Sequence, residues 1–437
     1  MTASRLMKLI ILLTLIIPQA FASYVTENFF VKLKKGKSLP ETDLISKSKN
    51  LFGELHIVYA DNQIVARDFF KSHPDVAYVE GNHKGERQNL VIEEPLEFID
   101  APQTGMLSFK DPYYSRLWAF KSSVVMGMGV DDAYVNFPRA HKDKIIVAVV
   151  DTGVDYNHPD LKNQMWVNKN EIAGNGIDDD LNGYIDDVHG INLLIKKGGK
   201  ATGNPMDGHM HGTHVAGTIA AAQNNGVAIA GVSSHARIMA IRAVPNSGDE
   251  TDLDVIEAFL YAGKNGAKII NCSFGKYKNE KGMAVSDAIK HIGDKYDTLV
   301  IAAAGNENNN IDKVSVYPAS YPNSNLLVVA ATTNRGRKAY FSNYGPKNVD
   351  LAAPGVGIYS TTPGSRVKSL SGTSMSSPNT AGVAAEILSQ YPELKALELK
   401  KIMMDSVTKS ARFKGKVGAA GMLNLNKALK AADDFTK

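Results

Sequence analysis

Residues 371–378 are Ser-Gly-Thr-Ser-Met-Ser-Ser-Pro, and they lead directly into an apolar helical pattern over residues 379–388. Small residues flank Ser374 on both sides, and Pro378 is of a type that suits the first turn of a helix. A serine in this position has a backbone N–H that points out of the helix N-terminus, where it can stabilise a developing oxyanion. The same pattern also fits an ordinary N-cap serine. The chemistry of Ser374 therefore depends on the partners that the rest of the chain offers.

Two upstream stretches offer such partners. The apolar run 145–150 ends at Asp151, and a helix start follows at His211-Gly212-Thr213-His214. A histidine can take the proton of a serine hydroxyl, and a carboxylate can orient the imidazole and stabilise its charged form. Both stretches therefore carry side chains of the types that can support a nucleophilic serine.

Together the three stretches resemble the subtilisin-like serine proteases (subtilases, peptidase family S8), in which the triad runs Asp, His, Ser along the chain. The resemblance extends from about residue 111 to the C-terminus. It implies a serine endopeptidase acting through an acyl-enzyme, with Ser374 as nucleophile, His211 as general base and Asp151 as the orienting carboxylate. Ser376 and Asn379 replace the alanine and histidine that are usual in this motif, and neither position carries proton chemistry.

The resemblance also implies the groups that bind the reacting peptide. Asn306, which ends the run 302–306, corresponds to the asparagine whose side-chain amide binds the oxyanion. Ser273-Phe274-Gly275 resembles the edge that pairs with the substrate backbone. Lys276 follows where many subtilisins have a small residue, so the preference of the first specificity pocket stays open.

Apolar runs alternate with helical patterns through the same region, which favours an α/β domain with a parallel sheet. The resemblance implies a subtilisin-like three-layer α/β/α fold with a mainly parallel sheet. Asp151 lies at the end of a predicted strand, where ligands bind in such folds. The runs are at 145–150, 237–244, 268–272, 299–304 and 326–331, and the helical patterns at 211–223, 252–264 and 282–295.

The chain is predicted to have three parts. Residues 1–22 have a basic start, a short apolar core and an Ala-Phe-Ala ending, which is typical of a signal peptide. We therefore expect secretion to the periplasm or the extracellular space. Residues 23–105 are predicted to be a propeptide with a linker, and residues 106–437 the catalytic domain. No later segment reaches the apolar length needed to span a membrane.

The propeptide is predicted to be a small α+β, ferredoxin-like unit with strands at 29–33, 55–59 and 76–80 and a helix at 64–72. It resembles the inhibitory propeptide of subtilases, which implies that it is an intramolecular inhibitor of an autoprocessed zymogen. Residues 90–103 are predicted to be a linker, with cleavage between 88 and 107. A permanent N-terminal binding domain is the alternative.

Composition excludes some other classes of protein. A formal net charge of +4, without a basic tract interleaved with aromatic residues, does not favour nucleic-acid binding. Cys272 is the single cysteine, so no internal disulfide can form, and its apolar surroundings predict an inert packing residue. We expect a monomer whose partners are protein or peptide substrates.

Residues 178–187 resemble the first half of a calcium-binding loop, with a glycine at the sixth position, but His189 stands where an EF-hand has its glutamate. Hard oxygen ligands favour a structural Ca²⁺, and an acidic, solvated loop is the alternative. A calcium site of some subtilisins is also matched at Asp160 and Asn225. The predicted ligands are Asp178, Asp180, Asn182, Asp186 or Asp187, with Asp160 and Asn225 at the second site.

Other enzyme classes fit the sequence less well. The Asp151-Thr152-Gly153 motif of an aspartic protease occurs once, without an all-β pattern. Ser376 breaks the G-x-S-x-G motif of α/β-hydrolases, and a sedolisin would lack His211 and Asn306. From another class, a catalytically inactive, secreted calcium-binding interaction protein on the same fold remains the alternative.

Overall fold

The computed structural model describes residues 28–84, 109–121, 127–138, 143–197, 200–277 and 282–437. The chain divides into two compact units, residues 1–84 and 85–437. The division at residue 84 lies within the part predicted to be propeptide and linker, residues 23–105. The predicted signal peptide, the linker at 90–103 and the predicted cleavage region between 88 and 107 lie outside the described residues. No described helix combines the length and apolarity needed to cross a membrane.

The N-terminal unit is an antiparallel sheet with the strand order β2-β3-β1-β4 and one described helix. Phe70 of the helix packs against Phe29 of the sheet, with 6.1 Å between the ring centroids. The three predicted strands and the predicted helix are all present. The elements are β1 (Asn28–Leu33), β2 (Lys47–Phe52), β3 (Leu55–Tyr59), α1 (Gln63–Ser72) and β4 (Val76–Gly81).

Two features of this unit differ from the prediction. β2 is not indicated by the hydrophobic pattern, because it is an edge strand whose first four residues are exposed and polar. Residues 34–46, between β1 and β2, form turns instead of the first helix of a ferredoxin-like β-α-β-β-α-β motif. The ferredoxin-like prediction therefore holds for the sheet and the second helix.

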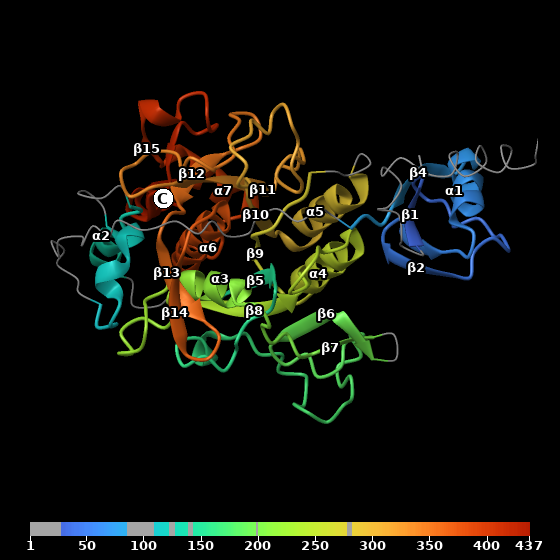
Figure 1. The fold of residues 1–437 in the computed structure, drawn as a ribbon, viewed down its shortest axis with the longest axis horizontal. Coiled ribbons are helices and arrows are strands. Elements are labelled where there is room, and N and C mark those ends of the chain that lie inside the picture. The colour runs from blue at the N-terminus through green and yellow to red at the C-terminus, as the bar shows by residue number, and fades with distance from the viewer. Residues whose placement is uncertain (1–27, 85–108, 122–126, 139–142, 198–199, 278–281) are drawn as a thin grey trace, which may run out of the picture. The chain divides into compact units, whose positions relative to one another are not determined.

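The larger unit contains a sheet with ten described strands, in the order β15-β16-β12-β11-β10-β9-β5-β8-β6-β7 (Figure 1). Neighbours from β16 to β6 are parallel, and the edge strands β15 and β7 are antiparallel to their neighbours. The five predicted apolar runs are β5, β8, β9, β10 and β11. The bounds are β5 (Ile145–Asp151), β6 (Gly190–Lys197), β7 (Lys200–Thr202), β8 (Ala236–Arg242), β9 (Ile269–Cys272), β10 (Leu299–Ala303), β11 (Leu326–Thr332), β12 (Leu351–Pro354), β15 (Thr408–Lys409) and β16 (Gly421–Met422).

Helices cover both faces of this sheet. α3 follows the β6–β7 pair and leads into β8, whereas α5 joins β9 to β10. α6 packs with α3, and α4 packs with α5, which confirms the three-layer α/β/α fold. The bounds are α2 (Val130–Asn136), α3 (His211–Ala220), α4 (Asp252–Lys264), α5 (Met283–Tyr296), α6 (Thr373–Gln390), α7 (Ala396–Asp405) and α8 (Leu425–Phe435), with a hairpin of β13 (Ile358–Thr362) and β14 (Arg366–Leu370) beside α3.

Helix α6 is buried along its whole length, and it starts earlier than the sequence pattern predicts. It begins at Thr373, so Pro378 lies inside the helix and not in its first turn, which corrects the prediction. Proline has no N–H, so the carbonyl of Ser374, four residues earlier, loses its helical partner. The Ser273 hydroxyl donates to that carbonyl at 3.0 Å. Tertiary packing therefore supplies the bond that the helix lacks.

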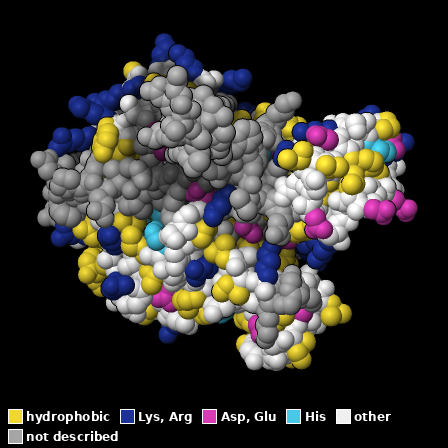
Figure 2. Space-filling view, turned by 45° about the vertical axis from the view of Figure 1, so that its right-hand side comes forward, with side chains coloured by type: hydrophobic (Ala, Val, Ile, Leu, Met, Phe, Trp, Pro, Cys, Tyr) yellow, Lys and Arg dark blue, Asp and Glu magenta, His cyan; other side chains and the backbone are white. Residues whose placement is uncertain are grey.

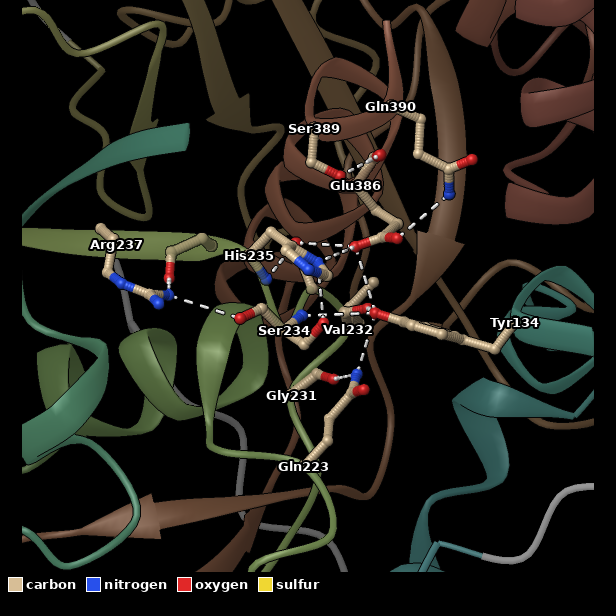
Figure 3. A network of polar contacts seen from close by, with 12 residues as sticks. Tyr134, Gln223, Gly231, Val232, Ser234, His235, Arg237, Glu386, Ser389 and Gln390 are labelled. Carbon is tan, nitrogen blue, oxygen red and sulfur yellow. Dashed lines mark hydrogen bonds and ion pairs between the residues drawn. The ribbon is translucent and has the colours of Figure 1, made fainter. Parts of the chain in front are cut away.

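A buried carboxylate, Glu386, ties the far half of α6 to its surroundings (Figure 3). Its Oε2 accepts hydrogen bonds from the hydroxyls of Tyr134 at 3.1 Å and Ser233 at 3.0 Å. Its Oε1 accepts from Gln390 Nε2 at 3.2 Å, and His235 Nδ1 lies 3.6 Å from Oε2. Burial, reinforced by the charge of Glu386, raises the pKa of Tyr134. The network joins α2, α6 and the segment before β8.

We expect Glu386→Ala to lower the free energy of unfolding by about 3 kcal/mol, because it leaves several buried donors without an acceptor. Urea unfolding of the Ser374→Ala protein, which lacks the candidate nucleophile, measures this loss. Glu393→Ala, at an exposed position just beyond α6, is the control and should change the value by less than about 0.5 kcal/mol. Equal losses in the two variants would contradict the role of the network.

Candidate active site

Asp151 and His211 meet at the junction of β5 and α3. Asp151 is the last residue of β5 and His211 the first of α3, and both are buried. His211 Nδ1 lies 2.8 Å from Asp151 Oδ1 and 3.0 Å from Oδ2. The bond makes Nδ1 the donor and leaves Nε2 as the basic nitrogen. Within the described residues, the buried Nε2 has no hydrogen-bond partner.

A second carboxylate, Asp207, holds this pair in place, and the sequence analysis missed it. It precedes His211 by four residues, whereas the N-cap position of α3 is Met210, so no local cap signal marks it. Its acceptor bonds come from residues on both sides of the Asp151–His211 pair. The donors are Thr152 Oγ1 (2.9 Å), His209 N (2.8 Å), Met210 N (3.0 Å), Thr213 N (3.0 Å) and Thr213 Oγ1 (2.6 Å).

Ser374 is the second residue of α6, where backbone N–H groups have no acceptor within the helix. Its hydroxyl donates to the Ser273 carbonyl at 3.0 Å. The structure records no hydrogen bond between Ser374 and His211, so the hydroxyl has to turn from Ser273 to reach Nε2. Catalytic hydrogen bonds are often loose without substrate.

Asn306 is anchored to the same helix end. Its Oδ1 accepts from the Thr373 N–H at 2.9 Å and from the Thr373 hydroxyl at 2.9 Å. The Gly305 N–H in turn donates to the Thr373 hydroxyl at 3.1 Å. Because Oδ1 is occupied by these bonds, Nδ2 is the donor side of the amide. The Asn306 side chain and the first turn of α6 are therefore linked in one hydrogen-bond network.

The predicted substrate edge continues β9. Phe274 and Gly275 are buried, and neither makes a backbone hydrogen bond within the described part of the chain. Such an edge can accept a peptide as an added strand. Lys276 ends the edge by pairing with Tyr317, with N···O distances of 2.9 and 2.8 Å. Its side chain is buried in an ion pair with Asp252.

The comparison with families decides the identity. Residues 142–421, well over half of the chain, match the profile of the Subtilase family, Peptidase S8. This chain belongs to the subtilase family.

Curated relatives and solved structures agree with this family assignment. Subtilisin-like protease 1 of Plasmodium vivax is 30% identical over 83% of this chain and 59% of its own length. Thermitase of Thermoactinomyces vulgaris is 39% identical over 56% of this chain and 75% of its own. A solved structure with a similar fold is that of fervidolysin from Fervidobacterium pennivorans, described as a keratinolytic enzyme related to subtilisin. It matches with a TM-score of 0.70 and 23% sequence identity, and the match covers 94% of this chain and 62% of that chain, which supports the fold. The chain spans less than two thirds of the first curated relatives' length.

Other titratable groups of this subtilase near the site are packing residues. His214 Nε2 lies 3.0 Å from the Ile358 carbonyl, and burial lowers the pKa of His214 to about 3, as expected for a neutral histidine in the core. His209 is partly buried. Cys272 is fully buried, and burial raises the pKa of its thiol well above the ordinary value, as expected for an inert residue.

The acidic loop brings together a set of carboxylates that differs in part from the predicted one. Ligand atoms of Glu171, Asp178 and Asp180 lie within 4.8 Å of one another. Glu171 was not predicted, because it precedes the motif by seven residues. Asp186 instead accepts from the backbone N–H groups of residues 175 and 176. Burial, with the charges of Asp180 and Asp179, raises the pKa of Glu171.

The remaining predicted ligands hold the loop together. Asn182 donates to Asp180 at 3.1 Å and to Asp187 at 3.0 Å. Asp187 is fully buried and also accepts from the Tyr261 hydroxyl, and burial raises its pKa to about 6. Asn182 thus links Asp187 to Asp180, and Asp187 is not one of the three carboxylates that converge.

The second predicted calcium pair, Asp160 and Asn225, is in direct contact. Asn225 Nδ2 donates to Asp160 Oδ1 at 2.7 Å, and the Ile229 N–H donates to Oδ2 at 3.0 Å. Burial, and to a lesser extent the charge of Asp111, raises the pKa of Asp160 to about 6. Protein donors bind both carboxylate oxygens, and calcium at this pair stays a prediction.

We expect Asp207→Ala to lower the free energy of unfolding by about 2 kcal/mol and to remove the low-field NMR resonance of the His211 Nδ1 proton. The reason is that four residues around the Asp151–His211 pair lose their shared acceptor. Asp434→Ala, which removes an exposed carboxylate on α8, is the control and should preserve the resonance. An unchanged His211 resonance in Asp207→Ala would show that Asp207 does not position the pair.

Proposed function

We propose that this subtilase is a serine endopeptidase that hydrolyses peptide bonds in proteins through Asp151, His211 and Ser374. The single observation that carries the proposal is the buried 2.8 Å contact between Asp151 and His211, which leaves Nε2 without a partner in the described structure. Ser374, at the start of α6, provides the hydroxyl for that nitrogen.

In the proposed acylation, the Ser374 hydroxyl leaves the Ser273 carbonyl and gives its proton to His211 Nε2 as Oγ attacks the scissile carbonyl. Asp151 keeps the proton on Nδ1 and stabilises the imidazolium. His211 then gives its proton to the leaving amine, and the acyl-enzyme remains on Ser374. In deacylation, a water molecule gives a proton to His211 Nε2 as its oxygen attacks the acyl carbon. His211 then returns the proton to Ser374 Oγ, and the carboxylic acid leaves.

The negative charge that develops on the carbonyl oxygen needs donors that are already in place. We assign this role to the Ser374 N–H and to Asn306 Nδ2. The bonds from Thr373 to Asn306 Oδ1 orient the amide before substrate arrives. The edge Ser273–Gly275 would pair with the substrate backbone on the acyl side.

We further propose that the protein is made as an exported zymogen, with residues 1–22 as signal peptide, 23–105 as inhibitory propeptide and linker, and 106–437 as a monomeric catalytic domain. The separate compact unit at residues 1–84 supports a propeptide. Self-cleavage between residues 88 and 107 would follow. A permanent N-terminal domain predicts instead that the purified protein keeps this unit.

Fluorophosphonate labelling tests the nucleophile. We expect wild type to label and Ser374→Ala to remain unlabelled and unprocessed on a denaturing gel. Asn306→Ala should lower kcat roughly 100- to 1,000-fold, the magnitude typical of one oxyanion donor. Labelling that persists in Ser374→Ala would refute the assignment. A folded, unlabelled wild type would favour the inactive, calcium-binding interaction protein.

We also propose that Glu171, Asp178 and Asp180 hold a structural Ca²⁺. Three carboxylates are hard oxygen ligands of the kind that calcium prefers. In the described part of the chain, neither Glu171 nor Asp180 forms an ion pair with lysine or arginine. Burial, and to a lesser extent the charges of Asp180 and Asp179, raises the pKa of Glu171, and a dication would offset both effects.

Removal of calcium should lower the thermal unfolding midpoint of the Ser374→Ala protein by about 5 °C, because the ion binds only the folded loop. Glu171→Gln should lose most of this response to a chelator. Asp186→Asn is the control in the same loop and should keep the response, because Asp186 contacts the backbone at residues 175 and 176. A midpoint that is insensitive to chelation in the parent protein would argue against the site.

A further inference from the structure

A strongly basic hollow lies on the larger unit, outside the groups described above. It has a volume of about 590 Å³ and contains four cationic side chains and no carboxylate. Figure 2 shows Lys and Arg side chains along the upper edge of this unit, the edge at which β15 lies in Figure 1. The lining residues are Asn308, Arg337, Lys338, Tyr340, Arg412 and Lys416.

The positive charges of the hollow are not neutralised by the protein. Arg337, Arg412 and Lys416 form no ion pair within the described residues. Exposed lysines elsewhere do, as in the helical pairs Lys401–Asp405 and Lys430–Asp434. On an ordinary solvent-exposed surface we would expect such pairs between lysine and aspartate. The absence of carboxylates from the lining of the hollow therefore indicates that its cations have another role.

Lys338 lines the hollow beside Lys416. It is half-buried, and burial together with the charge of Lys416 lowers its pKa to about 8. Its ammonium donates to Asn308 Oδ1 at 2.8 Å and to the Ser342 carbonyl at 2.7 Å. Its hydrogen-bond acceptors among the described residues are neutral oxygens. Arg412 closes the other wall, with Nη1 donating to the Arg335 carbonyl at 2.9 Å.

The nearest acidic residues along the chain are engaged elsewhere. Glu307 accepts from Asn343 Nδ2 at 2.9 Å. Asp312 accepts from the backbone N–H groups of Lys347 and Asn348. Neither carboxylate lines the hollow.

The hollow adjoins the proposed oxyanion site. Asn308 follows Asn306 by two residues, so their Cα atoms are at most about 8 Å apart. β9, β10 and β11 are adjacent and parallel, and the chain leaving them carries, in turn, the edge Ser273–Gly275, Asn306, and Arg337 with Lys338. The hollow therefore lies beyond Asn306 from the substrate edge, on the side where the leaving half of a peptide extends.

We propose that this hollow binds acidic side chains of a protein substrate, two to four residues on the C-terminal side of the scissile bond. The inference rests on the proposed function and names the substrate class that the same site prefers. Arg337 and Arg412 present guanidinium groups, which bind carboxylates through two parallel hydrogen bonds. An extended chain rises about 3.3 Å per residue, so these positions reach 7–13 Å from the reacting carbonyl.

Paired fluorogenic peptides test this preference. Both have the same acyl half, and they carry either Asp and Glu or Asn and Gln at the second to fourth residues after the scissile bond. We expect wild type to favour the acidic peptide about tenfold in kcat/KM at low ionic strength. Salt should reduce the ratio, because exposed charges are screened over about 10 Å at 0.1 M.

The combined variant Arg337→Gln, Arg412→Gln and Lys416→Gln should bring the ratio close to one, with the amide peptide as the internal reference for folding. The matched control Lys401→Gln, Lys427→Gln and Lys430→Gln removes the same charge from exposed positions on α7 and α8 and should keep the wild-type ratio.

Three results would overturn the inference. One is equal cleavage of both peptides by wild type, which leaves the proposed function standing. Another is a wild-type preference for the acidic peptide that survives in the hollow variant. The third is a kcat/KM ratio close to one in wild type together with binding of a sulfated polysaccharide that the hollow variant loses, which would show that the hollow binds a different polyanion. Failure to cleave either peptide, together with absent fluorophosphonate labelling, would overturn the proposed function itself.

Discussion

The burial of α6 is the constraint on which the rest of the larger unit depends. A helix that is packed on all sides must be made of small or apolar residues, and each polar group it carries needs a partner inside the protein. Gly382 is required because a side chain there would meet Val232 at 2.6 Å. Pro378 would break an exposed helix, but here the Ser273 hydroxyl replaces the missing bond. Because these contacts fix the first turn of α6, they also fix the position of Ser374, the candidate nucleophile.

Carboxylates around this helix follow the same rule. Asp207 receives backbone and side-chain donors at the start of α3, and Glu386 receives hydroxyl and amide donors beside α6. Asp151 shares its oxygens between Thr152 and His211. Because buried acceptors are costly without donors, each carboxylate fixes the elements that supply them. The active-site geometry is thus part of the same network that stabilises the fold.

Charge is distributed unevenly along the sheet. The acidic loop leads into β6, near one edge of the sheet, whereas the basic hollow lies among the loops after β11 and β15, toward the other. A net charge of +4 conceals this separation. A cation site at one end would serve stability, and an unpaired basic surface at the other would serve recognition.

The sequence by itself determined the buried strands and the main helices, and it singled out Asp151, His211, Ser374 and Asn306 as the candidate site, because continuous apolar runs and short motifs are local signals. Only the tertiary structure decided which distant groups meet. The edge strand β2 has no apolar pattern, Glu171 lies outside the acidic motif, and Arg337 and Arg412 are 75 residues apart. Pro378 was misplaced for the same reason, since its tolerance inside α6 depends on Ser273. Contacts between loops at the ends of parallel strands leave no periodicity in the chain, so no reading of local sequence can supply them.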